Sequence, residues 1–184
     1  IDRYSRALDQ AIMRYHAAKM DDINRVLRDL WTAVYQGADI DAVEIRADQE
    51  GTPANRSYNY RVVMLKGACE LDMRGRSSAR QRVLTSLLVR LALADSFALH
   101  CGILALDEPT TNLDRDNIRA LADALGDLIR VRRAQSNFQL VIITHDEEFV
   151  ECLARHECAE HYWRVSKDAR QHSIIERQSL ASSF

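Results

Sequence analysis

The fold of this chain of 184 residues is decided by the stretch C-G-I-L-A-L-D-E-P-T-T-N-L-D, which runs from Cys101 to Asp114. Its continuous apolar run, from Ile103 to Leu106, is typical of a strand buried on both faces of a parallel sheet. Pro109 ends the strand because it has no N–H to donate to a neighbouring strand. The stretch therefore predicts an α/β fold in which Asp107 and Glu108 emerge at the carboxyl end of a strand, where open α/β sheets bind ligands.

Two adjacent carboxylates at a buried strand end repel each other and are costly to desolvate. A cation or a phosphate-transfer reaction would give both acids a use. Asp107 could hold a hydrated Mg²⁺, and Glu108 could polarise an attacking water as a general base. The alternative is a solvated strand end with two surface acids. An isolated Asp-Glu pair would favour that alternative, but the flanking residues reverse the preference.

Composition limits the class of protein. With 47% apolar and 28% charged residues, the chain can form a core and is not disordered throughout. Its four cysteines have no C-x-x-C spacing, which argues against a zinc site. No apolar run reaches about 18 residues, so we expect no membrane partner. The chain begins without Met and in a helical pattern, from which we expect a piece of a longer protein.

The net charge of −2 carries no overall nucleic-acid signature, but the basic residues are unevenly distributed. Segment 61–90 contains seven Lys or Arg residues and only two acids, Glu70 and Asp72. We interpret this basic run either as a contact for DNA phosphates, independent of sequence, or as a solvated face.

The first 35 residues contain no Pro or Gly and predict one long helix. Apolar or seam positions recur there at spacings of three and four: Leu8, Ile12, His16, Met20, Ile23, Leu27, Leu30 and Val34. The later spacings form a heptad seam, typical of a coiled coil. The alternative is a single amphipathic helix packed on its own domain. We divide the chain into a coiled-coil helix over 1–36, an α/β lobe over 37–178 and a flexible tail over 179–184.

The remaining elements follow from periodicity and turn residues. We expect two strands joined as a hairpin at the sheet's edge, 41–46 and 58–66, a buried strand over 138–144, and a final hairpin from 160–165 and 172–177. We expect helices over 83–97, 114–132 and 147–153. Trp31 and Trp163 are expected in the core or at an interface.

A Ser-rich turn, M-R-G-R-S-S-A-R-Q-R over 73–82, leads into the helix expected at 83–97. The free N–H groups and the positive dipole end of a helix start favour an anion, and Ser78 could add a hydroxyl. The alternative is simple N-capping of the helix by Ser77 or Ser78.

His145 follows the strand expected over 138–144 and should therefore share an edge of the sheet with Asp107 and Glu108. An imidazole there could hydrogen-bond a phosphate oxygen or a nucleophilic water. The alternative is a histidine that caps a helix or packs.

No G-x-x-x-x-G-K-[ST] phosphate loop occurs in the chain, and none of its three lysines follows a glycine. A nucleoside triphosphate with Mg²⁺ would need such a loop. Either the loop lies on another chain, or the site is not for a nucleotide.

Three motifs together resemble the C-terminal half of an ABC-type ATPase: the Ser-containing segment before a helix, D-E-P-T-T-N-L-D after a strand, and T-H-D after another strand. Longer stretches, among them Y-N-Y-R-V-V-M-L-K-G, L-D-M-R-G-R and N-F-Q-L-V-I-I-T-H-D, resemble the coiled-coil ATPase subunit of the eukaryotic double-strand-break repair nuclease complex. The resemblance covers most of the chain. It implies the C-terminal lobe of an ABC-type P-loop ATPase head, a mixed or parallel sheet flanked by helices, with an N-terminal coiled-coil stump.

The resemblance also implies roles for particular residues. Asp107 would be the Walker B acid that holds Mg²⁺ through water, and Glu108 would be the catalytic base. His145 would be the switch histidine near the γ-phosphate, a second catalytic residue. Asn112 and Asp114 would belong to the D-loop, which crosses a dimer interface and borders the nucleotide.

Ser78, Ala79, Arg80 and Gln81 would form the signature segment, in which Ser78 contacts nucleotide bound to the opposite subunit. The family reads C-S-A-G-Q-K here, whereas this chain reads S-S-A-R-Q-R over 77–82. Arg80 therefore stands in the place of a glycine, where a Cβ penalises close backbone approach. The guanidinium could fill the phosphate position or bind phosphate bidentately. We expect weaker ATP-driven dimerisation.

ATP and Mg²⁺ are the cofactors that the resemblance implies, with zinc only at a hook that this chain does not contain. The implied partners are the N-terminal half of the same ATPase, which supplies the Walker A loop, a second head in a homodimer, a nuclease subunit docking on 1–36, and double-stranded DNA. The implied location is the nucleus and the chromosome.

These implications define an ATP-binding and ATP-hydrolysing head that drives head dimerisation, tethers DNA ends and controls a nuclease. The rival interpretation is a hydrolysis-poor structural DNA clamp in which Arg80 disables the signature. A third interpretation keeps the ABC machinery but assigns it to chromosome-condensing or transporter relatives.

Overall fold

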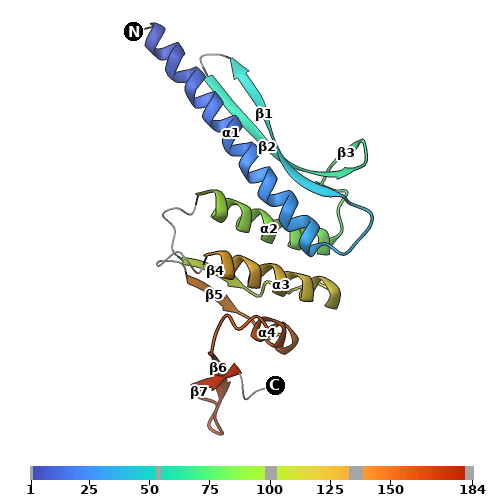
Figure 1. The fold of residues 1–184 in the computed structure, drawn as a ribbon, viewed down its shortest axis with the longest axis vertical. Helices are drawn as coiled ribbons and strands as arrows, with labels where there is room; N and C mark the ends of the chain where they lie inside the picture. Colours follow the sequence, from blue (N-terminus) through green and yellow to red (C-terminus); the bar gives the residue numbers. More distant parts are fainter. Residues whose placement is uncertain (1, 53–54, 98–102, 133–138, 181–184) are drawn as a thin grey trace.

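The computed structural model describes residues 2–52, 55–97, 103–132 and 139–180. Figure 1 shows a long helix that projects from one end of the molecule with a β-ribbon beside it, and a small hairpin at the other end. The described elements are, in order, α1 (Asp2–Val34), β1 (Ala42–Thr52), β2 (Asn55–Lys66), β3 (Cys69–Asp72), α2 (Ala79–Phe97), β4 (Ile103–Asp107), α3 (Arg115–Arg132), β5 (Gln139–Ile143), α4 (Glu147–Ala154), β6 (His161–Lys167) and β7 (Ser173–Ser179).

Helix α1 confirms the prediction of one long helix, and its apolar seam divides into two parts. Its C-terminal half packs on α2, β1 and α3, with Leu27 and Trp31 almost fully buried. Its N-terminal half leaves Leu8 and Ile12 more than half exposed. The helix is therefore part of the domain core in its second half, and a coiled coil along its first half stays a prediction.

Strands β1, β2 and β3 form an antiparallel sheet in that order, separate from the parallel pair. The hairpin expected at the edge of the parallel sheet was placed wrongly, and its strands are longer than predicted. Pairing continues through polar positions such as Asp48 opposite Asn59. A ribbon that extends into solvent needs no apolar alternation. The short strand β3 was not predicted; Gly67, with a φ of 54°, lies in the two-residue turn before it.

Strands β4 and β5 pair in parallel, but the prediction that β4 is buried on both faces is wrong for this chain. Leu104 and Leu106 contact the core, whereas Ile103 is 63% exposed. In β5, Ile142 contacts the core and Ile143 is 57% exposed. The described chain covers one face of this pair, so the side chains alternate between core and solvent.

The predicted helices are confirmed in kind, and α2 begins earlier than expected, at Ala79. Helix α3 packs against α4 and the turn after it, where Gly126 leaves room for the His156 ring. A Cβ at Gly126 would lie 2.5 Å from that ring.

The final hairpin is confirmed as β6–β7, but one expectation fails there. Ser179 belongs to β7 and not to a tail, and residues 181–184 lie outside the described part. Trp163 is 67% exposed, so it is not a core residue, and its place at an interface stays a prediction.

Cys69, Cys152 and Cys158 are free thiols, and Cys101 lies outside the described residues. No group of three or more His, Cys, Asp or Glu in the described ranges is arranged to hold a metal. None of the described helices has the length and apolar character needed to cross a membrane.

The division of α1 can be tested with one substitution made at two positions. Leu27→Ala should lower the free energy of unfolding by about 2–5 kcal/mol, because Leu27 is fully buried and truncation leaves a cavity. Leu8→Ala, at 64% exposure in the same helix, should change it by less than about 0.5 kcal/mol. Urea unfolding followed by circular dichroism measures both. Equal losses at the two positions would contradict the division.

Candidate functional site

The register of the parallel pair brings the predicted acids and the predicted histidine to one edge. Asp107 lies opposite Ile143, the last residues of β4 and β5. The backbone N–H of Glu108 donates to the carbonyl of Ile143 at 2.8 Å, so the two chains stay paired one step beyond the strands. His145 follows two residues later, at the same edge. The sequence-based prediction that these residues share an edge is confirmed.

Glu108 and His145 are in direct contact. Nδ1 of His145 lies 2.7 Å from Oε2 of Glu108. That oxygen is shielded from solvent and has no further partner among the described residues. The hydrogen bond and the negative charge of Glu108 raise the pKa of His145 above its ordinary value. The pair therefore joins a half-buried carboxylate to an exposed imidazole, and this contact favours the charged form of the imidazole.

The loop after β4 has an unusual backbone. Glu108 and Asn112 adopt the left-handed conformation, with φ of 46° and 62°. For a residue other than glycine this costs on the order of 1–2 kcal/mol. Two turn hydrogen bonds hold the loop, from Thr111 N to the Glu108 carbonyl at 3.2 Å and from Leu113 N to the Thr110 carbonyl at 3.0 Å. Such strain, maintained by its surroundings, is a feature of functional sites.

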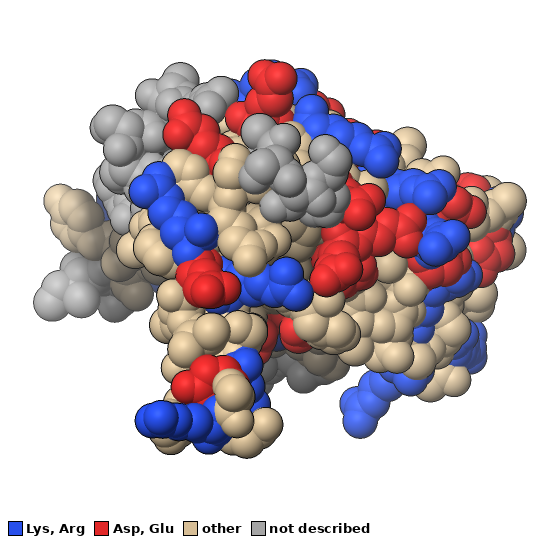
Figure 2. All heavy atoms as spheres, turned by 90° about the horizontal axis from the view of Figure 1, so that it is seen from below, with Lys and Arg blue, Asp and Glu red and all other residues tan. Residues whose placement is uncertain are grey.

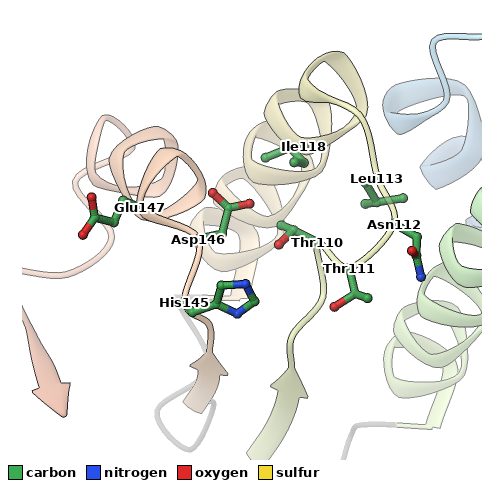
Figure 3. A pocket seen from close by; sticks show the side chains of 8 residues that line it. All are labelled: Thr110, Thr111, Asn112, Leu113, Ile118, His145, Asp146 and Glu147. Carbon is green, nitrogen blue, oxygen red and sulfur yellow. The ribbon is translucent and has the colours of Figure 1, made fainter. Parts of the chain in front are cut away.

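An open hollow of about 630 Å³ lies beside this edge, between the loop after β4 and the start of α4. Figure 3 shows His145 at its base, turned toward Thr111, while Glu147 points away. Its lining residues are Thr110, Thr111, Asn112, Leu113, Ile118, His145, Asp146 and Glu147. The Thr110 and Thr111 side chains and the His145 imidazole lie near one another here, which suits a polar ligand.

A second hollow, of about 300 Å³, places α2 beside the two acids. Arg82, Ser86 and Arg90 of α2 line it together with Asp107 and Glu108. Asp107 is exposed to solvent at the strand end. Basic and acidic groups thus face one space, which suits phosphate and a divalent cation together.

The signature segment begins α2 as a capping box. The Gln81 N–H donates to Oγ of Ser78 at 3.2 Å, and the Ser78 N–H donates to Oε1 of Gln81 at 2.9 Å. Ser77 instead donates its hydroxyl to the Met73 carbonyl at 2.8 Å. The capping alternative is therefore confirmed for Ser78. Its hydroxyl is also exposed at the helix start, as is Ala79.

Arg80 is engaged within the chain. Its guanidinium forms an ion pair with Asp114, the residue just before α3, and both side chains are close to half exposed. Asp114 also accepts from the N–H and from the side-chain amide of Asn117, at 3.1 and 2.5 Å. Arg80 thus ties the predicted signature segment to the predicted D-loop.

Sequence reasoning missed the residues that hold Gln81 from the other side. Nε2 of Gln81 donates to Oη of Tyr35 at 3.1 Å and to Oδ2 of Asp39 at 2.9 Å. Tyr35 and Asp39 lie just after α1, more than forty positions away in the chain. No local pattern signals such a contact. Asn117 could have been found, since an Asp followed three residues later by Asn is a capping pattern.

Three of the seven basic residues in the run 61–90 form ion pairs within the described chain. Arg61 contacts Asp48 and Glu70, Lys66 contacts Asp41, and Arg80 contacts Asp114. Figure 2 shows acidic and basic side chains intermixed on the face seen from below. Arg74 and Arg76 are exposed on the turn between β3 and α2, and Arg82 and Arg90 are exposed on α2. A contact of this run with DNA phosphates therefore stays a prediction.

These features define a class of protein. The chain aligns with a solved structure from a study of ATP-driven dimerisation and DNA-stimulated activation of SMC ATPases. The TM-score is 0.62 at 17% identity, over 95% of this chain and 92% of that one. The fold is that of the C-terminal lobe of an ABC-type ATPase head.

Sequence relatives narrow the class. The chain is 55% identical over 181 residues to the DNA repair protein RAD50 of Dictyostelium discoideum and 54% identical over 177 residues to that of Saccharomyces cerevisiae, matches that cover 98% and 96% of it. A relative from Methanopyrus kandleri, named DNA double-strand break repair Rad50 ATPase, is 34% identical over 108 residues, or 56% of this chain. The chain belongs to the Rad50 family, as the motif resemblance predicts.

The chain corresponds to one part of those proteins. It spans 13%, 14% and 11% of the length of the three relatives. No model of a known protein family matches it.

The contact between His145 and Glu108 makes a prediction about titration. The pKa of His145 should lie above the ordinary histidine value of about 6.5, since Glu108 favours the charged imidazole. The attraction is fully present below the ordinary value and is lost as the pH rises through the raised one. Glu108→Gln should lower the pKa of His145, as followed by NMR of the imidazole.

A matched control is Glu148→Gln. Glu148 is a nearby carboxylate, but its ion pairs are with Arg115 and Arg119. If both variants moved the titration of His145 equally, the specific role of Glu108 would be wrong.

Proposed function

We propose that this chain is the ATP-binding and ATP-hydrolysing head segment of a DNA double-strand-break repair complex, and that it completes its site with an N-terminal half. The observation that carries the proposal is the contact of Glu108 with His145 at the carboxyl end of the parallel pair. The name of the Methanopyrus relative, a double-strand break repair Rad50 ATPase, supports the same function.

In this proposal Glu108 is the general base that orients and polarises the attacking water, and His145 senses the γ-phosphate. Phosphoryl transfer depends on positioning and charge stabilisation more than on covalent chemistry. The left-handed backbone of Glu108 supports its role, since it turns the chain sharply at the strand end. Asp107, one residue earlier, is left exposed at the hollow beside α2.

Asp107 would hold Mg²⁺, mostly through water. Mg²⁺ in nucleotide sites keeps several waters and takes one or two carboxylates together with phosphate oxygens. At the hollow beside α2 the exposed carboxylate of Asp107 would be one such ligand, and no cluster of three His, Cys, Asp or Glu occurs among the described residues, so water and phosphate oxygens would be the other ligands. The ion would neutralise part of the negative charge of the phosphates.

The signature segment would act on nucleotide bound to a second head in a homodimer. Ser78 and Ala79 are exposed at the start of α2, where free N–H groups and the helix dipole favour phosphate. Arg80 and Gln81 are turned toward the protein itself. Of the four signature residues, Ser78 and Ala79 would therefore be the ones that reach across.

The N-terminal half is the proposed cover for the bare face of β4 and β5. Ile103, Val141 and Ile143 leave apolar surface exposed on that face, as a sheet does when a layer lies on it. The proposed domains are the coiled-coil helix 1–36 and the lobe 37–178, extended by the end of β7. Leu8 and Ile12 would meet a coiled-coil partner or the nuclease subunit. In this proposal the head also binds double-stranded DNA and acts in the nucleus, on the chromosome.

The rival, a hydrolysis-poor DNA clamp, is not favoured by the comparisons, because a relative is named as an ATPase. A transporter assignment is likewise not favoured by the Rad50 relatives.

Glu108→Gln tests the proposed chemistry in this chain combined with its N-terminal half. Hydrolysis should fall by about 10²–10⁴-fold, since the variant cannot accept a proton. ATP binding should be kept, since the amide preserves shape and removes one negative charge beside the phosphates. Phosphate release and nucleotide-binding titrations measure the two. Hydrolysis at the parent rate in the variant would refute the proposal.

Arg80→Gly tests the departure in the signature segment. Glycine removes the Cβ and releases Asp114 from its ion pair, so ATP-driven dimerisation of heads should increase. Light scattering with and without ATP measures the dimer. The control is Arg76→Gly, which removes an exposed arginine just before α2. Unchanged or weaker dimerisation in Arg80→Gly would contradict the expectation that Arg80 weakens ATP-driven dimerisation.

A further inference from the structure

Gln81 is held by three hydrogen bonds that use its whole side-chain amide. Oε1 accepts from the Ser78 N–H at 2.9 Å, and Nε2 donates to Tyr35 Oη at 3.1 Å and Asp39 Oδ2 at 2.9 Å. A backbone N–H must face the carbonyl oxygen, and a carboxylate must face the amide N–H groups. The amide therefore has one orientation that satisfies all of its partners.

Tyr35 is itself fixed by its surroundings. Its side chain is buried, and its ring stacks on Trp31 with centroids 4.3 Å apart. Its hydroxyl donates to Oδ1 of Asp39 at 2.5 Å. Burial raises the pKa of Tyr35, and the hydrogen bond from Tyr35 lowers the pKa of Asp39. At neutral pH a protonated phenol thus faces a charged carboxylate, and the phenol oxygen is free to accept from Gln81.

The same end of α1 also reaches the start of α3. The Gln36 N–H donates to Oδ1 of Asn117 at 3.1 Å, and Asn117 donates to Asp114, the partner of Arg80. Asn117 is almost fully buried. The turn after α1 therefore contacts the signature segment on one side and the D-loop on the other.

We infer that Tyr35 and Asp39 are positioning residues that act through Gln81 to set the start of α2, and with it the Ser78 hydroxyl and the free N–H groups aimed at the nucleotide of the opposite head. The inference rests on the proposed function and adds residues outside its motifs. A residue of this kind should affect the step that needs the second head and leave nucleotide binding to its own head unchanged. This difference between the two steps distinguishes a positioning residue from one whose loss damages the fold in general.

The test uses the full-length protein that carries this segment. Tyr35→Phe removes one hydroxyl and keeps the ring stacked on Trp31. Loss of two hydrogen bonds at the hydroxyl should reduce ATP-dependent head dimerisation and kcat about tenfold. ATP affinity measured at concentrations where heads are unpaired should not change. Asp39→Asn should act in the same direction, since it weakens the acceptor for Gln81.

The matched control is Tyr162→Phe. That hydroxyl also donates to a glutamine side chain, to Gln178 Oε1 at 2.6 Å, but in the hairpin β6–β7. It should leave both dimerisation and kcat at the parent values. A Tyr35→Phe variant that behaves like Tyr162→Phe would overturn the inference.

A double-mutant cycle tests the route through Gln81. If Tyr35 acts through Gln81, adding Tyr35→Phe to Gln81→Ala should cause no further loss of dimerisation. Additive losses would overturn the inference, because Tyr35 would then act by another path. Glu108→Gln in the same assay keeps the two proposals apart. If it hydrolyses ATP normally, the proposed chemistry fails, whereas the cycle still reports on the positioning of the signature segment through dimerisation.

Discussion

Asp107 lies opposite Ile143 in the parallel pair of β4 and β5, and this register decides where the acids and the imidazole of the site fall. Side chains alternate along a strand, so a shift of one residue would exchange the core and solvent faces of β4. Leu106 would leave the core, and Glu108 would no longer stand within 2.7 Å of His145. Packing of the sheet and chemistry at its edge are therefore specified by the same contacts.

A second group of predicted site residues lies at the starts of α2 and α3. The loop after β4 connects this group with the acids at the end of β4. This loop is anchored at one end by the Glu108 N–H on the Ile143 carbonyl. At the other end Asp114 caps α3 through Asn117 and pairs with Arg80. Anchors at both ends explain how the left-handed conformations of Glu108 and Asn112 persist. The segment between Glu108 and Asp114 is therefore short and fixed at both ends.

The sequence allowed the strand ends and the shared edge to be predicted, because a buried run followed by polar residues is a local signal. It allowed the helices to be predicted because apolar periodicity and turn residues are local signals as well. The strands β1 and β2 were predicted too short, since their outer pairs are polar on a ribbon with few neighbours. The contact of Tyr35 with Gln81 joins residues 46 positions apart, so no window of sequence contains it. The contact of Gln81 with nucleotide stays a prediction, whereas its side-chain amide donates to Tyr35 and Asp39, just after α1.

One face of β4 and β5 is left uncovered by the described chain, and the candidate site lies at the end of the same two strands. A two-stranded parallel sheet buried on one side has little stability of its own, because parallel sheets are normally covered on both faces. Ile103 of β4 and Val141 and Ile143 of β5 have exposed apolar side chains. Because these residues are apolar, the sequence predicts buried strands here. A layer supplied by the proposed N-terminal half would bury them and hold β4 against β5. The distance between Glu108 and His145 depends on that pairing, so the half that would bring the phosphate loop would also fix the catalytic edge.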